Sequence, residues 1–225
     1  MNEFLLKTEE LHKVYNHNKR QSAHVLRGIN LEIKEGLILA IVGPSGAGKS
    51  TLLNILGGLD QPTSGRVLFK EIDLYKLSDT ELSQIRNRAF GFVFQFYHLL
   101  AEFNVLENVM LPAMIKKDNL KITQKKAQEL LERAGLKGKE DSFPAQLSGG
   151  EQQRVAICRS LINEPKILFC DEPTGNLDSH TGAEIISLLK ELNLKNKMTI
   201  VLVTHNEELS RIADKIFHLK DGILN

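Results

Sequence analysis

The sequence predicts an α/β fold with a mostly parallel sheet, and three short apolar segments carry that prediction. Each has the length and composition of a strand buried on both faces, and helical segments alternate with these strands along the chain. Each of the three also ends in glycine or polar residues. Ligands of open α/β sheets bind at the carboxyl ends of the strands, so these ends are expected to converge on one site. The three segments are 37–42, 166–172 and 199–205.

Length and composition predict one large domain. The 225 residues are 42% hydrophobic, which suffices for a full core. A formal net charge of +1 lacks the basic excess of a sequence-independent nucleic-acid binder, so no nucleic-acid partner is expected. The sequence contains no apolar run near the ~20 residues that cross a bilayer and no signal peptide at its start. We therefore expect a cytosolic chain that reaches a membrane only through partners.

The segments around the first core strand predict an antiparallel edge. Residues 5–11 and 29–33 alternate between apolar and polar, as short strands do, and the polar stretch 16–24 between them predicts an exposed turn. An apolar helix is expected over 51–59, and a short hairpin over 66–73. Ser78 and Glu81 form a capping box that begins a helix ending near Arg88. A strand over 90–94 follows and ends at Gln95.

A mainly helical block follows this strand. Asn104 and Glu107 predict the start of one helix, and Pro112 predicts a kink or break within it. Thr123 predicts the cap of a second helix, which Gly135 ends. This block breaks the alternation of strands and helices. We therefore expect a single domain over 1–225 whose core comprises 1–94 and 160–225, with 95–159 as an inserted helical sub-lobe.

Two further helices and a final turn complete the prediction. One helix begins within 147–154, and Asp178 is expected to cap another that follows the second core strand. Asp221 and Gly222 predict a tight hairpin turn near the end of the chain. Cys158 and Cys170 are far apart in sequence and form no C-x-x-C pair, so we expect two buried free thiols.

The segment between the first core strand and its helix fits the phosphate-binding pattern G-x-x-x-x-G-K-[ST]. Glycines allow successive backbone N–H groups to turn toward an anion, and the helix N-terminus adds its positive end. Lys49 supplies a charge for the β- and γ-phosphates, and the Ser50 hydroxyl is a ligand for Mg²⁺. The sequence thus predicts a nucleoside triphosphate site formed by Gly43, Pro44, Ser45, Gly46, Ala47, Gly48, Lys49, Ser50 and Thr51.

The other two strand ends supply groups for hydrolysis. Asp171 is expected to hold Mg²⁺ directly or through water, and Glu172 to orient and deprotonate the attacking water. His205 would contact the γ-phosphate. Each residue also has a simpler alternative, because adjacent acids at a strand end often only cap a helix and a lone histidine is more often structural.

Several motifs together resemble ATP-binding cassette (ABC) ATPases, and the chain is identified as similar to that family over almost its whole length. LSGGEQQR at 147–154 resembles the family signature, ILFCDEP at 167–173 the Walker B segment with its catalytic glutamate, and GNLD at 175–178 the D-loop. Gln95 matches the Q-loop and His205 the switch histidine. The resemblance implies a P-loop NTPase fold of the ABC type, with a parallel core, antiparallel N-terminal strands and a helical sub-lobe.

The resemblance also implies partners and further site residues. Two copies of the chain would close over two ATP molecules, each held between the P-loop of one copy and the signature of the other. It implies that Tyr15 stacks on adenine and that Gln95 contacts Mg²⁺ or water. Integral membrane permease subunits would be the other partners. Further nucleotide contacts would come from the signature and D-loop residues Ser148, Gly149, Gly150 and Asp178.

Within the family, three segments are most similar to the ATPase subunits of lipoprotein-releasing transporters: GGLDQPTSG, RNRAFGFVFQF and YHLLAEFNVLENVMLP. This implies a peripheral protein on the cytoplasmic face of the inner membrane. ATPases of macrolide or peptide exporters and of the cell-division complex are alternatives, as is a regulatory module that recruits envelope machinery. The apolar run after Gln95, comprising Phe96, Tyr97, Leu99 and Leu100, predicts the docking site of a permease helix.

Overall fold

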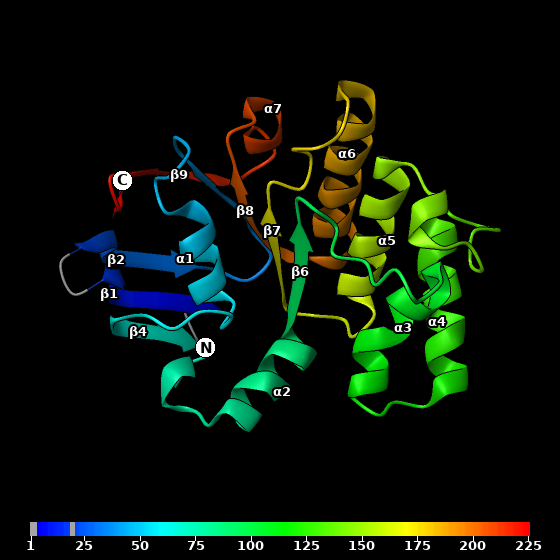
Figure 1. Ribbon diagram of the computed structural model, residues 1–225, viewed down its shortest axis with the longest axis horizontal. Helices are drawn as coiled ribbons and strands as arrows, with labels where there is room; N and C mark the ends of the chain where they lie inside the picture. The colour runs from blue at the N-terminus through cyan, green and yellow to red at the C-terminus, as the bar shows by residue number, and fades with distance from the viewer. Residues whose placement is uncertain (1–3, 19–20) are drawn as a thin grey trace.

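Two sheets organise the computed structural model, which describes residues 4–18 and 21–225 (Figure 1). The larger sheet has six strands in the order β10-β9-β3-β8-β7-β6. Neighbouring strands within this sheet are parallel, except that β10 runs antiparallel to β9. The three predicted core strands lie side by side within it, as β3 (Ile38–Val42), β8 (Thr199–Thr204) and β7 (Ile167–Asp171). The outer strands are β6 (Phe90–Phe94), β9 (Lys215–Lys220) and β10 (Ile223–Leu224).

The second sheet is antiparallel, with the order β2-β1-β4-β5, and confirms the predicted N-terminal edge. Its strands are β1 (Leu6–Asn18), β2 (Gln21–Ile33), β4 (Ser64–Phe69) and β5 (Ile72–Asp73). The predicted turn over 16–24 was too long, because β1 and β2 remain paired as far as Asn18 and Gln21, and residues 19 and 20 between them lie outside the described residues. A two-stranded ribbon pairs through backbone hydrogen bonds alone, so the polar sequence there gave no signal of a strand.

The larger sheet is covered on both faces. One face packs against α1 (Lys49–Leu56) and the antiparallel sheet, in a core that includes Ile41, Leu52 and Phe169. The other face packs against α6 (Ser179–Asn196) and α7 (Glu207–Ser210), with Ile185 and Leu189 fully buried. The helix α2 (Asp79–Ala89), which follows the 3₁₀ turn Leu74–Lys76, begins at the predicted capping box and leads into β6. This arrangement confirms the α/β class with both sheet faces buried.

Three helices form the inserted block and pack together beside the sheet (Figure 1). They are α3 (Val105–Ile115), α4 (Leu120–Arg133) and α5 (Gly149–Leu161), with a 3₁₀ turn at Pro144–Gln146 before α5. Capping boxes begin α3 at Asn104 and α5 at Ser148. No helix in the described ranges is both long and apolar enough to span a bilayer.

Two predictions about these helices differ from the structure. Of the kink or break expected at Pro112, the break was wrong, because α3 is continuous from Val105 to Ile115 and the Lys116 N–H donates to the Pro112 carbonyl at 3.2 Å. The missing Pro112 N–H removes a single helical hydrogen bond. The cap of α4 is Asn119 rather than Thr123. The Asn119 side chain accepts from the N–H groups of the first helical turn, and Thr123 is buried inside the helix.

Candidate nucleotide-binding site

The P-loop connects the end of β3 to α1 in the backbone conformation that its glycines allow. Gly48 has φ 99°, and a Cβ there would lie 2.9 Å from a methyl carbon of Val25. A Cβ at Gly43 would lie 2.1 Å from the Leu219 carbonyl oxygen, so only glycine fits. The Lys49 ammonium, largely buried, donates to the carbonyls of Gly43 and Pro44 at 2.9 and 3.0 Å. These bonds hold the loop closed around its positive charge.

The N-terminus of α1 has free donors for an anion. Its N-cap is Gly48, which has no side chain to accept a hydrogen bond, and the first turn carries no acidic residue. The N–H groups of the first turn are therefore available, and the helix dipole adds partial positive charge beside Lys49. This end of α1 is suited to bind phosphate.

A hydroxyl and a carboxylate meet where a divalent cation would sit. Ser50, in the first turn of α1, donates to Asp171 at 3.1 Å, and Asp171 ends β7. Burial raises the pKa of the Asp171 carboxyl; Ser50 and Lys49 oppose that rise and Glu172 adds to it. Across the described residues, no group of three His, Cys, Asp or Glu side chains could hold a metal. Two oxygen ligands fit Mg²⁺ that also binds a phosphate chain and water.

Glu172 is fastened to the end of β8 through both carboxylate oxygens. Oε1 accepts from the His205 N–H at 3.0 Å and lies 2.7 Å from the His205 Nδ1. Oε2 accepts from the Thr204 hydroxyl at 3.0 Å. The Glu172 backbone has φ 47°, and its N–H donates to the Val203 carbonyl. The Glu172 side chain is 13% exposed and that of His205 70% exposed, so the histidine faces solvent above a held carboxylate.

Five separate segments line one cleft of about 680 Å³. The P-loop and the start of α1 form one wall, and Gln95, Glu172 and His205 reach the same space. Val25 of β2 also lines the cleft. The sequence did not predict this, because the alternation of apolar and polar residues in a strand does not show which apolar residue lines a site. The structure thus brings together the predicted phosphate site and the two candidate catalytic side chains.

Gln95 and Tyr15 are both held by polar neighbours. Gln95 exchanges hydrogen bonds with Asn176, which the sequence did not single out.

The Tyr15 hydroxyl donates to Asp60 at 2.6 Å, and the Lys13 ammonium lies 4.6 Å from the Tyr15 ring centre and 2.7 Å from Asp60. Tyr15 is not among the residues that line the cleft. Burial, and then the hydrogen bond to Asp60, raise the pKa of the Tyr15 hydroxyl, and Thr51 has a smaller lowering effect on it.

The signature residues lie outside this cleft. Ser148 caps α5 by accepting from the Glu151 N–H at 3.2 Å. Gly150 packs so tightly on α6 that a Cβ would lie 2.1 Å from the Thr181 methyl carbon. Asp178 caps α6, accepting from both the N–H and the hydroxyl of Thr181. The N-terminus of α5, which carries the signature residues, therefore lies apart from the cleft at the P-loop of the same chain.

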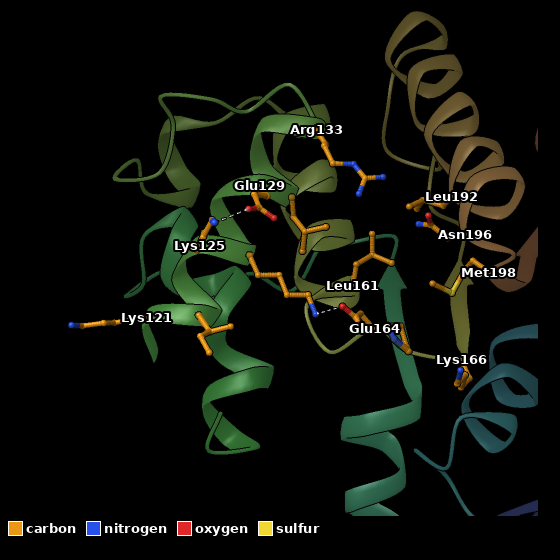
Figure 2. Close-up of a pocket in the computed structure, with 14 residues that line it drawn as sticks. Lys121, Lys125, Glu129, Arg133, Leu161, Glu164, Lys166, Leu192, Asn196 and Met198 are labelled. Carbon is orange, nitrogen blue, oxygen red and sulfur yellow. Dashed lines mark ion pairs between the residues drawn. The ribbon is translucent and has the colours of Figure 1, made fainter. Parts of the chain in front are cut away.

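A larger hollow, of about 1020 Å³, lies elsewhere and shows that size alone would misplace the site. It is bounded by α4, the end of α5 and the end of α6. Figure 2 shows the Lys125–Glu129 ion pair along it, and Lys126 forms a second ion pair with Glu164 at 2.8 Å. Its apolar lining residues include Leu130, Leu161, Leu192 and Met198. None of the predicted site residues lines this groove in the described chain.

Comparison with known proteins agrees with the fold and the motifs. The model of the family "ABC transporter" matches residues 26–175. A lipoprotein-releasing system ATP-binding protein LolD of Bdellovibrio bacteriovorus is 49% identical, with 96% of this chain and 98% of that protein covered. The LolD of Cytophaga hutchinsonii is 47% identical, with 98% of each covered.

Two solved structures are also similar. A dimeric post-hydrolysis state of the ATP-binding cassette MJ0796, bound to ADP and Pi, superposes with a TM-score of 0.90 at 43% identity and covers 98% of this chain and 97% of that one. Another dimeric structure of MJ0796, a bacterial ABC transporter cassette, has a TM-score of 0.89 at 44% identity, covering 96% and 95%. By sequence, fold and motif order, this chain belongs to the ABC transporter family.

Proposed function

We propose that this chain hydrolyses ATP to drive a membrane transporter. The observation that supports it most is the cleft shared by the P-loop, Glu172 and His205. Lys49 and the free N–H groups of α1 bind the β- and γ-phosphates. Glu172 orients a water molecule and accepts its proton as the water oxygen attacks the γ-phosphorus, and ADP leaves. His205, exposed above Glu172, contacts the γ-phosphate.

Magnesium would be held by Ser50 and Asp171, with Gln95 beside them. Their oxygen atoms are the ligand type that Mg²⁺ prefers, and Ser50 and Asp171 already lie within hydrogen-bonding distance. When bound, the ion neutralises charge on the phosphates. In the protein, Asp171 is partly buried at the end of β7, and this burial raises the pKa of its carboxyl.

A second copy of the chain completes each site. Ser148 caps α5, Gly149 and Gly150 form its first turn, and none of the three lines the chain's own cleft. The Ser148 N–H already donates to Glu151 Oε2 at 2.8 Å, so the N–H groups of Gly149 and Gly150 would bind a phosphate held by another chain. A two-fold axis would then place the signature of each copy opposite the P-loop of the other copy, with Asp178 at the interface between them. The similarity to dimeric cassettes supports this arrangement.

The permease would dock in a groove of about 490 Å³ between α2, β6 and α3. Its apolar side chains include Phe94, Leu100, Leu111, Pro112 and Ile115, which suit a short amphipathic helix. Of the four residues first expected to dock, only Leu100 lines this groove. Leu99 packs on the helical core, Phe96 is exposed beside it, and the Tyr97 hydroxyl approaches Gly149 of the signature.

The transporter that fits best is a lipoprotein-releasing system, which places the chain on the cytoplasmic face of the inner membrane. Relatives with that name match almost the whole chain at nearly half identity. The test is co-purification from membranes with identification of the bound subunits, together with ATP hydrolysis by the complex. Lipoprotein release that depends on ATP and on this chain would support the proposal. Binding to a macrolide exporter or a division protein instead would contradict it.

A further inference from the structure

Thr204 is the last residue of β8, and its side chain is fully buried beside the candidate site. Its hydroxyl oxygen accepts a hydrogen bond from the Asn206 N–H at 2.9 Å. The same hydroxyl lies 3.0 Å from Glu172 Oε2, to which it donates. A threonine hydroxyl carries one proton, and the Asn206 bond orients the oxygen so that this proton points to the carboxylate. The contact therefore has one defined direction.

Glu172 needs such an anchor because its own backbone does not favour its position. Its φ of 47° is unusual for a residue with a Cβ, and its peptide N–H is tied to Val203. The other oxygen, Oε1, is shared by two groups of His205, whose ring is exposed and free to move toward a ligand. When the His205 ring turns away, the His205 backbone N–H still holds Oε1, and the buried Thr204 hydroxyl holds Oε2. Thr204 is therefore the side chain that fixes the second oxygen and with it the plane of the carboxylate.

From this geometry we propose that Thr204 is a positioning residue that holds the Glu172 carboxylate in the direction needed for attack on the γ-phosphate. The inference rests on the proposed role of Glu172 as the base. Without the hydroxyl, the carboxylate would rotate about its side-chain bonds, and fewer bound ATP molecules would have a correctly placed water. The effect falls on kcat, because Thr204 touches no phosphate-binding group.

The test compares Thr204→Val with Thr204→Ser. Thr204→Val nearly keeps the side-chain shape but removes the hydroxyl that donates to Glu172 and accepts from Asn206. The kcat for ATP hydrolysis should fall about 10-fold or more, with KM for ATP within about twofold. Thr204→Ser keeps the hydroxyl and should restore most of kcat. A normal kcat in Thr204→Val, or an equally low one in Thr204→Ser, would overturn the inference.

A matched control lies at the other end of the same strand. Thr199 is also fully buried, and its hydroxyl accepts from the Gly36 N–H at 2.9 Å, far from the cleft. Thr199→Val should lower the melting temperature as much as Thr204→Val does, yet leave kcat unchanged. An equal loss of kcat in both variants would mean that Thr204 acts only through stability, and would reject the positioning role.

A double variant separates this inference from the proposed function. If Thr204 acts through Glu172, Thr204→Val should cause no further loss when added to Glu172→Gln, measured in single turnovers. A further tenfold loss would reject that route. Near-normal hydrolysis by Glu172→Gln alone would instead remove the base assignment, and the positioning role with it. A dead Glu172→Gln beside an unaffected Thr204→Val would reject only the positioning role.

Discussion

Gln95 and Asn176 hold each other through two hydrogen bonds, although 81 residues separate them. The Gln95 side-chain amide donates to Asn176 Oδ1 at 3.1 Å, and the Asn176 amide donates to the Gln95 carbonyl at 2.9 Å. Gly175 leaves room for this pair, since a Cβ there would lie 2.9 Å from Gln95 Nε2. The pair thus connects the segment after β6, which leads to the proposed permease groove, with the loop 175–178, which is expected to face a second copy of the chain.

Removal of this pair should loosen the segment after β6. In Asn176→Ala, both hydrogen bonds are lost, and amide hydrogen exchange over residues 95–98 should become faster, with little change in melting temperature. Asn30→Ala is the control, because within residues 4–18 and 21–225 the Asn30 side chain forms hydrogen bonds only inside the N-terminal sheet. Exchange that stays at the wild-type rate in Asn176→Ala would show that the pair does not restrain Gln95.

The docking groove can be tested with a pair of variants of equal exposure. Ile115 in the groove is 66% exposed and Leu194 on α6, outside it, is 70% exposed, so an aspartate at either position should not disturb the core. Ile115→Asp should abolish co-purification with the permease while ATP binding persists. Leu194→Asp should assemble normally. Assembly by both variants would place the permease elsewhere.

Tyr15 should serve both ATP binding and stability. If the ring stacks on adenine, a contact worth ~1–3 kcal/mol, Tyr15→Ala should weaken ATP binding by about 5- to 150-fold. Tyr15→Phe keeps the ring and should bind ATP normally, but it loses the hydrogen bond to Asp60 and about 1 kcal/mol of stability. Calorimetric titration and thermal melts measure the two effects. Unchanged ATP affinity in Tyr15→Ala would leave only the structural role.

Both thiols should be inert in the folded chain. Burial raises the pKa of the Cys158 thiol to about 12 and that of Cys170 further still, where Asp171 adds to the rise. At pH 8 a thiol reagent should therefore label neither cysteine until denaturant unfolds the protein, when both should react. Rapid labelling of either one before unfolding would contradict the burial of that side chain.

The parts of the fold that sequence predicts best are those with strong local chemistry. Ser78, Asn104 and Ser148 each precede a glutamate by three residues, and each begins a helix with a capping box. The buried strands before Gly43 and Glu172 were equally clear, because no polar residue interrupts them. Since parallel strands end at one edge, the meeting of Lys49, Glu172 and His205 at one cleft followed.

What the sequence did not predict depends on contacts between distant segments. No local pattern links Tyr15 to Asp60, Gln95 to Asn176 or Thr204 to Glu172, since each pair forms only when separate strands and loops meet. The Asn119 cap was missed because Thr123 offered a competing signal. The buried Asn108, which donates to three carbonyls of the loop before α3, looked like any polar helix residue.

The central claim is that two copies of this chain hydrolyse ATP between them, with Glu172 as the base. Glu172→Gln should bind ATP but hydrolyse it roughly 10²–10⁴-fold more slowly, and the bound ATP should hold two chains together. Sedimentation velocity of this variant, with and without saturating Mg-ATP, is the most direct measurement. We predict a shift from monomer to dimer on addition of Mg-ATP. A monomer at saturating Mg-ATP would contradict the shared site.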